Sequence, residues 1–496
     1  MTPKTEQILV NVTPQECRVA LIENGMLQEL HIERADAKGI VGNIYKGKVV
    51  RVLPGMQAAF VEIGLERTAF LHAKDAHSMI INGEDTNEGD EKSEPAITSL
   101  VREGQEILVQ VVKDPIGSKG ARLTTELSIP SRVLVYLPKA TNIGISQRIT
   151  DESIRENLRS MIEATRDTHQ SKGGYIARTT AEKSSEKELQ LDMEILARLW
   201  SKASQKAQKN KAPALVYEDL PLSQRVLRDF VTDSVAELLV DSKETHDKLC
   251  ALAAEIIPDA LPLIKHYPGG RPIFDLHSIE DEIERALGRE VPLKSGGTLV
   301  IDQTEAMTIV DVNTAGFVGK RNLEETVFKT NLEAAQSIAR QLRLRNIGGI
   351  IIVDFIDMLD KGHQQQVVKA LERGLSKDST KNNLTDVSTL GLVEITRKRT
   401  RESLERLLME DCPVCSGRGA LKTPQTVCNE ILREILREAR QYEASKFMVV
   451  ASQAVVDRML DEESSSLADL QEFIGSPVHL QVEPTYFQEN YDVVLT

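Results

Sequence analysis

The sequence lacks long apolar runs, an excess of positive charge and enough cysteines for a disulfide framework. No apolar run approaches a membrane span, and the first residues, Met1-Thr-Pro-Lys-Thr-Glu6, lack the apolar core of a secretory signal. Five cysteines, an odd number in a long chain without such a signal, indicate reduced thiols in a cytoplasmic protein. The net charge of −14 argues against a surface covered with polyanion-binding residues, but a local basic groove is compatible with it.

The length of the chain predicts several domains. At 496 residues it exceeds the size at which one hydrophobic core stops growing. Residues 7–34 alternate like strands around the turn signal Asn24-Gly25, which predicts an antiparallel start. Short strands with closely spaced glycines follow at residues 42–76 and suit a small barrel. The strand pattern resumes at residues 106–112, so the acidic, weakly apolar residues 83–94 are predicted to be a loop inside the barrel.

The remaining sequence predicts mixed structure. Residues 128–220 combine strand and helix patterns, and residues 221–290 indicate mainly helices. A regular unit follows as strand 297–313, helix 322–346 and strand 349–355, whose two strands should be parallel. The last 50 residues or so indicate a small mixed lobe. The predicted fold class is therefore α/β and α+β in several domains.

Two aspartates and an asparagine on this unit are candidate catalytic residues. Side chains alternate across a strand, so Asp311 and Asn313 share a face. The strand Gly349-Ile-Ile-Ile-Val-Asp354 is a continuous apolar run, which predicts burial on both faces and a charge only at Asp354. Both aspartates fall at C-terminal ends of strands, where open α/β sheets place ligand sites. Two carboxylates and an amide there predict a Mg²⁺ site.

Such a site suits phosphodiester hydrolysis, because a metal polarises a phosphoryl oxygen and activates a water. Asn313 would orient the phosphate or that water. For either aspartate alone, the ordinary polar end of a strand is the simpler interpretation, and it is the pairing on one unit that favours function. Asp357 is a further candidate for the metal shell, while Asp360 is predicted to be a loop residue.

Aromatic residues are only 4% of the chain, yet several rings gather in the predicted barrel beside basic side chains. These residues are Tyr45, Phe60, Phe70 and His72, with Lys46, Lys48, Arg51, Arg67, Lys113, Lys119 and Arg122. Interleaved rings and cations suit single-stranded nucleic acid, because bases stack on rings while phosphates meet charges. Phe60 and Phe70 could instead be core residues. A further basic run, residues 396–401, follows the carboxylates in sequence.

The stretch Cys412-Pro-Val-Cys415, followed by glycines, presents two thiolates to one zinc ion, and a tetrahedral site needs four ligands. The chain offers no second pair, because Cys17, Cys250 and Cys428 each stand alone in a predicted strand or helix and indicate core positions. His363 is about 50 residues away, a poor match to the close spacing of finger-type sites. Two chains that each contribute this pair would complete the tetrahedron.

Eight stretches resemble the ribonuclease E/G family in order and spacing, over essentially the whole chain. They are Asn43-Ile-Tyr-Lys-Gly-Lys48, Ala58-Ala-Phe-Val-Glu-Ile-Gly64, Ile301-Asp-Gln-Thr-Glu-Ala-Met307, Asp311-Val-Asn-Thr314, Thr330-Asn-Leu-Glu-Ala-Ala335, Arg340-Gln-Leu-Arg-Leu-Arg-Asn-Ile-Gly-Gly349, Val353-Asp-Phe-Ile-Asp-Met358 and Cys412-Pro-Val-Cys415. The resemblance implies a Mg²⁺-dependent endoribonuclease that cuts single-stranded, A/U-rich RNA. It further implies stimulation by a 5′-monophosphate, products with 5′-phosphate and 3′-hydroxyl ends, and roles in 16S ribosomal RNA maturation and messenger RNA decay.

The resemblance also implies an order of domains. They are a ribonuclease H-like subdomain in two parts (residues 1–37 and 222–288), an S1 RNA-binding domain (38–127), a 5′-sensor domain (128–221), a DNase I-like catalytic domain (289–405), a zinc link (406–420) and a small C-terminal domain (421–496). The family links subunits through zinc, which implies a homodimer with one zinc ion per two chains, and dimers that could pair into tetramers.

Individual residues acquire roles in the same way. The matches are Asp311 and Asp354 to the magnesium ligands, Asn313 to the accompanying asparagine, Phe60, Phe70 and Lys119 to RNA-binding positions of the S1 domain, and Arg178 and Thr179, with the backbone of Val135, to the 5′-monophosphate pocket. A guanidinium and a hydroxyl suit a phosphate dianion. The chain departs from the family pattern Ile-Ser-Arg-Arg at Ile145-Ser-Gln-Arg148, because Gln147 removes a cation near that pocket. Alternative interpretations are an RNA-binding protein without catalysis and a metal-dependent DNase.

Overall fold

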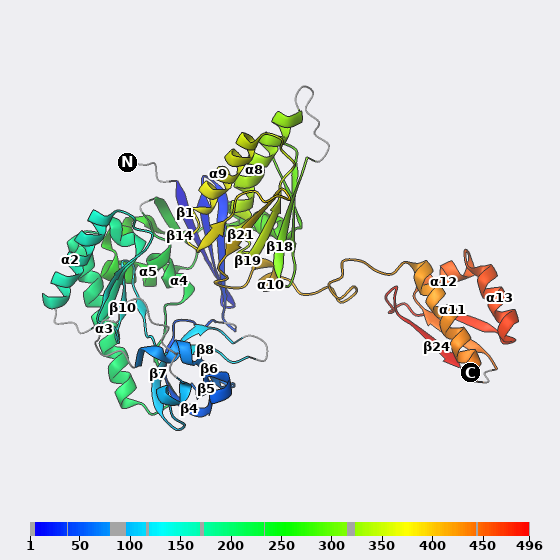
Figure 1. Ribbon diagram of the computed structural model, residues 1–496, viewed down its shortest axis with the longest axis horizontal. Helices are drawn as coiled ribbons and strands as arrows, with labels where there is room; N and C mark the ends of the chain where they lie inside the picture. The colour runs from blue at the N-terminus through cyan, green and yellow to red at the C-terminus, as the bar shows by residue number, and fades with distance from the viewer. Residues whose placement is uncertain are drawn as a thin grey trace. The chain divides into compact units, whose positions relative to one another are not determined.

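The computed structural model describes residues 5–36, 38–79, 96–115, 119–168, 173–232, 234–314, 323–442 and 445–495. The chain divides into two compact units, Met1–Leu404 and Glu405–Thr496 (Figure 1). The predicted acidic loop, residues 83–94, lies outside the described residues. Among the helices that are described, none is long and apolar enough to cross a membrane.

A five-stranded mixed sheet begins the larger unit. Its strands, in spatial order, are β15 (Ile264–His266), β14 (Val235–Val240), β1 (Glu6–Val12), β2 (Glu16–Glu23) and β3 (Met26–Arg34). The antiparallel start predicted for residues 7–34 is confirmed, and β14 joins β1 in parallel.

The prediction of mainly helices for residues 221–290 is only partly right. The helices there are α4 (Leu222–Asp229), α5 (Lys243–Ile256), α6 (Ile273–Leu276) and α7 (Ile279–Leu287). The strands β14 and β15 interrupt them. A short apolar run such as Val235–Val240 is not distinguished from a buried helical segment by periodicity alone, and its strand partner lies more than 200 residues earlier in the chain.

Five strands close into the predicted small barrel. They are β4 (Ile44–Leu53), β5 (Ala58–Glu62), β6 (Ala69–His72), β8 (Arg122–Thr124) and β7 (Glu106–Lys113), and pairing of β4 with β7 closes the ring. Strand β13 (Ala214–Tyr217) extends the sheet along β4. Alternate residues of these strands, including Val49, Val61, Leu71 and Val109, fill the interior.

A four-stranded sheet follows the barrel. Its strands, in spatial order, are β11 (Ile143–Ile145), β12 (Gly174–Ala177), β10 (Leu134–Leu137) and β9 (Ile129–Pro130). The helices α2 (Glu152–Thr168) and α3 (Glu186–Lys209) share a core with it. A capping box between Ser185 and Glu188 starts α3, since each residue's side chain accepts a backbone N–H of the other.

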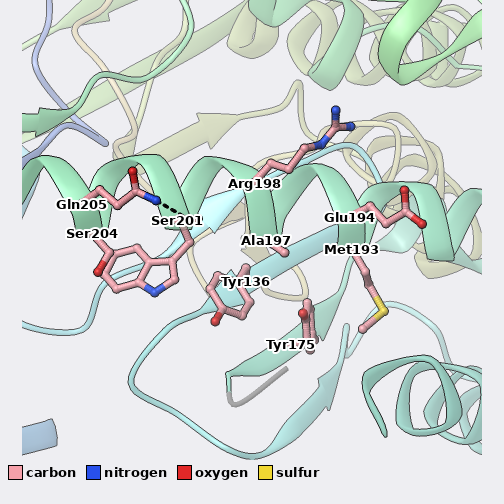
Figure 2. A pocket seen from close by; sticks show the side chains of 10 residues that line it. Tyr136, Tyr175, Met193, Glu194, Ala197, Arg198, Ser201, Ser204 and Gln205 are labelled. Atoms are coloured by element: carbon pink, nitrogen blue, oxygen red, sulfur yellow. Dashed lines mark hydrogen bonds between the residues drawn. The ribbon is translucent and has the colours of Figure 1, made fainter. Parts of the chain in front are cut away.

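The side chains of Tyr136 and Tyr175 show which face of this small sheet is turned toward α3. Figure 2 shows both rings beneath α3, where they border an open pocket of about 550 Å³, and their centroids lie 5.2 Å apart. Because side chains alternate along a strand, the neighbours Val135 and Ile176 point to the opposite face. Ile176 on the face away from α3 is 37% exposed, whereas Tyr175 is buried on the face toward α3.

A six-stranded sheet completes the larger unit. Its order is β16 (Glu290–Pro292), β17 (Thr298–Gln303), β18 (Met307–Asn313), β19 (Gly349–Asp354), β21 (Leu392–Arg397) and β20 (Asn382–Leu384). As predicted, β18 and β19 are parallel and are joined by a helix, α8 (Leu323–Leu344). The single strand predicted for residues 297–313 is wrong, because a turn at residues 304–306 folds it into the antiparallel hairpin β17–β18.

Within the part of the chain that the structure describes, helices cover one face of this sheet and leave the other exposed. Helices α8 and α9 (Lys361–Leu375) pack on the covered face through a shared core that includes Ile338, Val353 and Leu371 (Figure 1). On the other face Ile309 is 42% exposed and Ile350 is 48% exposed. The predicted burial of Gly349–Asp354 on both faces is therefore wrong, since this strand has a helical layer on one side only.

The smaller unit is the predicted small mixed lobe. Its sheet has the order β23 (Val478–Val482), β22 (Phe447–Ala451) and β24 (Tyr491–Leu495). Its helices are α11 (Pro424–Gln441), α12 (Gln453–Leu460) and α13 (Ser464–Ile474). The buried face of α11 carries Val427, Ile431 and Ile435.

Candidate active site and nucleic-acid interface

Asp311 and Asp354 are direct neighbours across the parallel strands β18 and β19. Each aspartate is the last charged residue of its strand, on the exposed face of the sheet, and both side chains are exposed. Neighbouring strands lie about 4.8 Å apart, so one cation can reach both carboxylates. The amide of Asn313 donates to Oδ2 of Asp311 over 2.8 Å. The predicted placement of the pair is confirmed, while the catalytic roles stay a prediction.

The electrostatics of the pair favour a cation. Partial burial raises the pKa of Asp354 above its ordinary value, and the nearby charges of Asp311 and Asp357 raise it further. A divalent ion would remove this repulsion. Within the described ranges no group of three or more His, Cys, Asp or Glu residues is arranged to hold a metal. Two carboxylates still suit Mg²⁺, because this ion keeps several waters and takes its remaining oxygens from a phosphate substrate.

Backbone geometry around the pair depends on residues that sequence reasoning did not single out. A Cβ at Gly297 would lie 2.7 Å from the carbonyl oxygen of Asn313, so only glycine permits this close approach beside the site. The buried side chain of Asn331 on α8 donates to the carbonyl of Ile356 and accepts from its N–H, which fixes the chain just after Asp354. In the sequence, Asn331 could have been noticed as an amide side chain within the apolar face of a predicted helix. A buried amide is normally hydrogen-bonded, so such a position indicates a structural role.

The basic run at residues 396–401 does not lie beside the carboxylates. Because β21 runs antiparallel to β19, Arg397 pairs with Gly349, whereas Leu392 pairs with Asp354. Five residues of strand place this end about 17 Å from the pair. Arg397 itself is buried in an ion pair with Asp378. The run is therefore near the carboxylates in sequence but not in space, and the reversal of the strand is the reason.

On the barrel, Phe60 and Phe70 are register partners of β5 and β6. Their ring centroids lie 6.2 Å apart at an interplanar angle of 69°, and His72 lies 6.3 Å from Phe70. All three rings are only partly buried. Tyr45, in contrast, belongs to the barrel core. Three of the four predicted rings therefore form one accessible aromatic cluster.

The basic residues around the barrel differ in their surroundings. Lys46 pairs with Glu106 at 2.9 Å, and Arg122 pairs with Asp75 at 2.8 Å. Lys119 is exposed at the start of the segment that leads into β8. These ion pairs reduce the charge that Lys46 and Arg122 offer to a phosphate, so Lys119 is the strongest candidate of the three.

Arg178 and Thr179 follow directly after β12. The guanidinium of Arg178 donates through Nη1 to the carbonyl of Ser131 at 2.5 Å and through Nη2 to Oδ1 of Asp229 at 3.1 Å. The hydroxyl of Thr179 lies 3.4 Å from that of Ser146. Thr179 thus lies beside Ser146, whereas the guanidinium of Arg178 is held by Ser131 and Asp229, and a role of the two residues in 5′-phosphate binding stays a prediction.

Val135 lies on β10, between β9 and β12, and pairs with Ile176. Its backbone thus lies in the strand next to β12, and β12 leads directly to Arg178. Gln147 is exposed, and the next residue, Arg148, donates through Nη2 to the carbonyl of Ser379 at 2.5 Å. Where the family pattern has two successive arginines, this chain has only Arg148, and Arg148 contacts the segment before β20.

A buried carboxylate that sequence reasoning missed holds the loop behind Arg178. Asp192 on α3 accepts from the hydroxyl of Ser131 at 2.5 Å and from the N–H groups of Val133 and Leu134. Burial raises its pKa, although these hydrogen bonds and the charge of Arg178 oppose the shift. The available signal was an aspartate in the apolar face of a helix, where an acidic residue is rarely buried without partners.

In the smaller unit, Cys412 and Cys415 occupy a tight turn. The N–H of Ser416 donates to the carbonyl of Cys412 at 2.7 Å, and Ser416 and Gly417 both have positive φ. Hydrogen bonds from the backbone N–H groups of Cys415 and Val414, together with one from the Cys415 side chain, lower the pKa of Cys412. An exposed turn that favours a thiolate fits a half-site for zinc.

The other cysteines are in or beside apolar cores, as expected. Cys428 is fully buried in the core of the smaller unit. Cys17 and Cys250 pack against the core of the first sheet, and burial, reinforced by Glu33 and Asp241, raises the pKa of Cys17 to about 12.

Comparison with known proteins agrees with this geometry. The family model described as "Ribonuclease E/G family" matches residues 128–400, and the model "RNase E/G, Thioredoxin-like domain" matches residues 411–495. Ribonuclease G of Escherichia coli K12 is 52% identical over 99% of this chain and 100% of its own length. Ribonuclease G of Haemophilus influenzae is 49% identical over 99% of both chains. Ribonuclease E of Escherichia coli K12 is 36% identical over 93% of this chain and 43% of its own length. The chain therefore belongs to the ribonuclease E/G family.

Proposed function

We propose that the chain is a Mg²⁺-dependent endoribonuclease that cuts single-stranded RNA and leaves 5′-phosphate and 3′-hydroxyl ends. Membership of a ribonuclease family establishes the class of enzyme and RNA as its substrate. The observation that carries the metal dependence is the register pairing of Asp311 and Asp354 on an open sheet face. An exposed face admits a flexible single strand, which can bend its backbone toward two carboxylates.

The side chains of Asp311, Asn313 and Asp354 would have different roles. Asp311 and Asp354 would hold the ion between them, and Asn313, hydrogen-bonded to Asp311, would fix the carboxylate and contact a phosphate oxygen or the attacking water. Bound there, Mg²⁺ would stabilise negative charge on the phosphoryl group and favour ionisation of a water nucleophile. Exposed Ile309, two residues before Asp311 on the same strand face, would give the RNA an apolar surface against which a base can lie.

The barrel and the small sheet would supply RNA recognition. Under this proposal the barrel is an S1 domain in which Phe60, Phe70 and Lys119 bind the strand, because the two partly buried rings lie 6.2 Å apart and the Lys119 side chain is exposed. Arg178 and Thr179 would bind a 5′-monophosphate in a sensor domain, assisted by the backbone of Val135. The first sheet would be the ribonuclease H-like subdomain and the six-stranded sheet the DNase I-like domain. Family roles in 16S ribosomal RNA maturation and messenger RNA decay, at A/U-rich sites, complete the proposal.

Cleavage of a short A/U-rich RNA tests this function. The substrate carries either a 5′-monophosphate or a 5′-hydroxyl, and each is incubated with Mg²⁺ or with EDTA. The proposal expects cleavage only with Mg²⁺, faster for the monophosphate. Binding without any cleavage would favour the alternative of an S1-type RNA-binding protein, which the aromatic cluster on the barrel would support. Equal cleavage of the 2′-deoxy strand with deoxyuridine at each uridine would favour a DNase, since the 2′-hydroxyl is then the only group that distinguishes the two strands.

Replacing Arg178 with alanine should remove most of the preference for a 5′-monophosphate. A hydrogen bond to a charged group contributes about 1.5–3 kcal/mol, so the ratio of kcat/KM for monophosphate over hydroxyl RNA should fall by about 10- to 150-fold. Arg159→Ala is the matched control, because Arg159 is exposed on α2 and the change in net charge is the same. A ratio that survives in Arg178→Ala but falls in the control would contradict the assignment of the phosphate to Arg178.

Loss of one thiolate should dissociate the proposed homodimer. Four thiolates from two chains complete a zinc tetrahedron, so we expect about one zinc ion per two chains, and Cys415→Ala should yield monomers with little bound zinc. Native mass spectrometry of wild-type and variant protein measures both quantities. Cys428→Ala is the control, because that thiol lies in the core of the same unit. One zinc ion per chain, or zinc-containing dimers of Cys415→Ala, would refute the shared site. Tetramers of the wild-type protein would mean that the dimers associate through a second interface.

A further inference from the structure

Arg178 is the outer end of a chain of alternating charges. Asp229, the last residue of α4, accepts from Arg178 at 3.1 Å and from Nε and Nη2 of Arg228 at 3.1 and 3.0 Å. Arg228 in turn donates to Asp219 at 2.7 Å. The order is therefore Arg178, Asp229, Arg228, Asp219. The side chains of Arg228 and Asp219 are only 8% and 13% exposed, so the inner end of this chain is fixed within the fold.

Asp229 is held rigidly enough to orient another side chain. Arg228 grips both of its carboxylate oxygens at once, which is the geometry that fixes a carboxylate in orientation as well as in position. Burial would raise the pKa of Asp229, but the hydrogen bonds and charge of Arg228 and the charge of Arg178 outweigh this, so its pKa is lowered and it stays ionised. Oδ1 of Asp229 is thus a fixed acceptor for Arg178.

The second anchor of Arg178 is equally defined. Its Nη1 donates to the carbonyl of Ser131, and the hydroxyl of Ser131 is bound to the buried carboxylate of Asp192. The two bonds fix both terminal nitrogens of the guanidinium, yet they use only two of its five N–H donors. The remaining donors are left in a set direction, which is what recognition of a phosphate by an otherwise flexible side chain requires.

We propose that Asp229 is a positioning residue that sets the orientation of Arg178 and, through it, the preference for a 5′-terminal phosphate. The inference rests on the proposed 5′-end site. Asp229 is a fixed acceptor, because Arg228, which also binds Asp219, holds both of its carboxylate oxygens. It therefore orients Arg178, whose other N–H donors are directed toward a phosphate.

Asp229→Asn tests the proposal, since the asparagine has nearly the same shape but turns one oxygen into an N–H donor that faces the arginines. The ratio of kcat/KM for 5′-monophosphate over 5′-hydroxyl RNA should fall about tenfold, the size of one lost charge-assisted hydrogen bond. The fall should appear in KM for the monophosphate RNA, because the phosphate contact is made on binding. Thermal melting of the variant shows whether the fold is retained.

Asp219→Asn is the matched control. It removes a carboxylate from the same buried Arg228, but none of the hydrogen bonds of Asp219 involves Arg178. We expect a similar loss of stability and an unchanged ratio. Equal falls in both variants would overturn the proposal in favour of a structural role, and a higher ratio in Asp229→Asn would overturn it in favour of competition with the phosphate. If wild type cuts both RNAs equally, the proposed 5′-end site fails first, and this inference fails with it.

Discussion

Asp354→Asn should reduce cleavage of single-stranded RNA by at least about a hundredfold while RNA binding is retained. Loss of one group that stabilises transition-state charge typically lowers the rate by about 10²–10³-fold. With asparagine at position 354, Asp311 is the one carboxylate of the register pair that remains for a metal. The fold should not suffer, because Asp354 is exposed and its neighbours Asp311 and Asp357 repel it. Replacement by a neutral side chain relieves that repulsion, so the melting temperature should be unchanged or slightly higher.

The control for this experiment lies on β17, two strands from β19 in the same sheet. Asp302 on β17 belongs to the same sheet, and its register partner Ile309 lies two residues before Asp311. Asp302→Asn removes the same charge, so it should lower cleavage by less than about twofold if only the local pair matters. Single-turnover cleavage with Mg²⁺, together with RNA binding by anisotropy, separates chemistry from affinity. An Asp354→Asn protein that cuts at the wild-type rate would exclude this pair as the metal site.

The placement of the carboxylate pair was predictable because it depends on short-range rules. Alternation along one strand puts Asp311 and Asn313 on one face, and the order strand, helix, strand makes the neighbouring strand parallel. The position of the basic run was not predictable in this way. It is only about 40 residues beyond Asp354, but β21 runs in the opposite direction, and sequence distance carries no information on strand direction.

Partners remote in sequence explain the remaining differences. Arg178 was recognised only from family resemblance. Its hydrogen-bond partner Asp229 lies on α4, and Asp192, which binds the Ser131 hydroxyl behind it, lies on α3. The strand Val235–Val240 has its neighbour at the N-terminus of the chain, so neither its length nor its periodicity distinguished it from a helical segment. The open face of the six-stranded sheet was missed for a related reason. An apolar strand indicates burial, whereas the structure leaves Ile350 exposed because no element described here packs over that side.

Asp378→Ala should destabilise the six-stranded sheet by about 3–5 kcal/mol, the usual cost of leaving one member of a buried ion pair alone. The side chains of Asp378 and Arg397 are 1% and 4% exposed, and Arg397 donates to both carboxylate oxygens. Its other bonds, to the side chains of Asn346 and Thr380 and the carbonyl of Ile347, are to neutral groups that do not balance the charge. Removal of Asp378 therefore leaves a buried cation within β21.

The expected effect is local, so hydrogen exchange of the β19 and β21 amides is the appropriate measurement. Arg289 and Asp302 provide the comparison, because they form an equally short bidentate pair at the surface. Disruption of that pair by Asp302→Ala should cost no more than about 1 kcal/mol. If both variants lose the same protection, burial of the Arg397–Asp378 pair contributes nothing beyond the ion pair itself. A large difference would mean that the buried Arg397–Asp378 pair stabilises the sheet that carries the carboxylates.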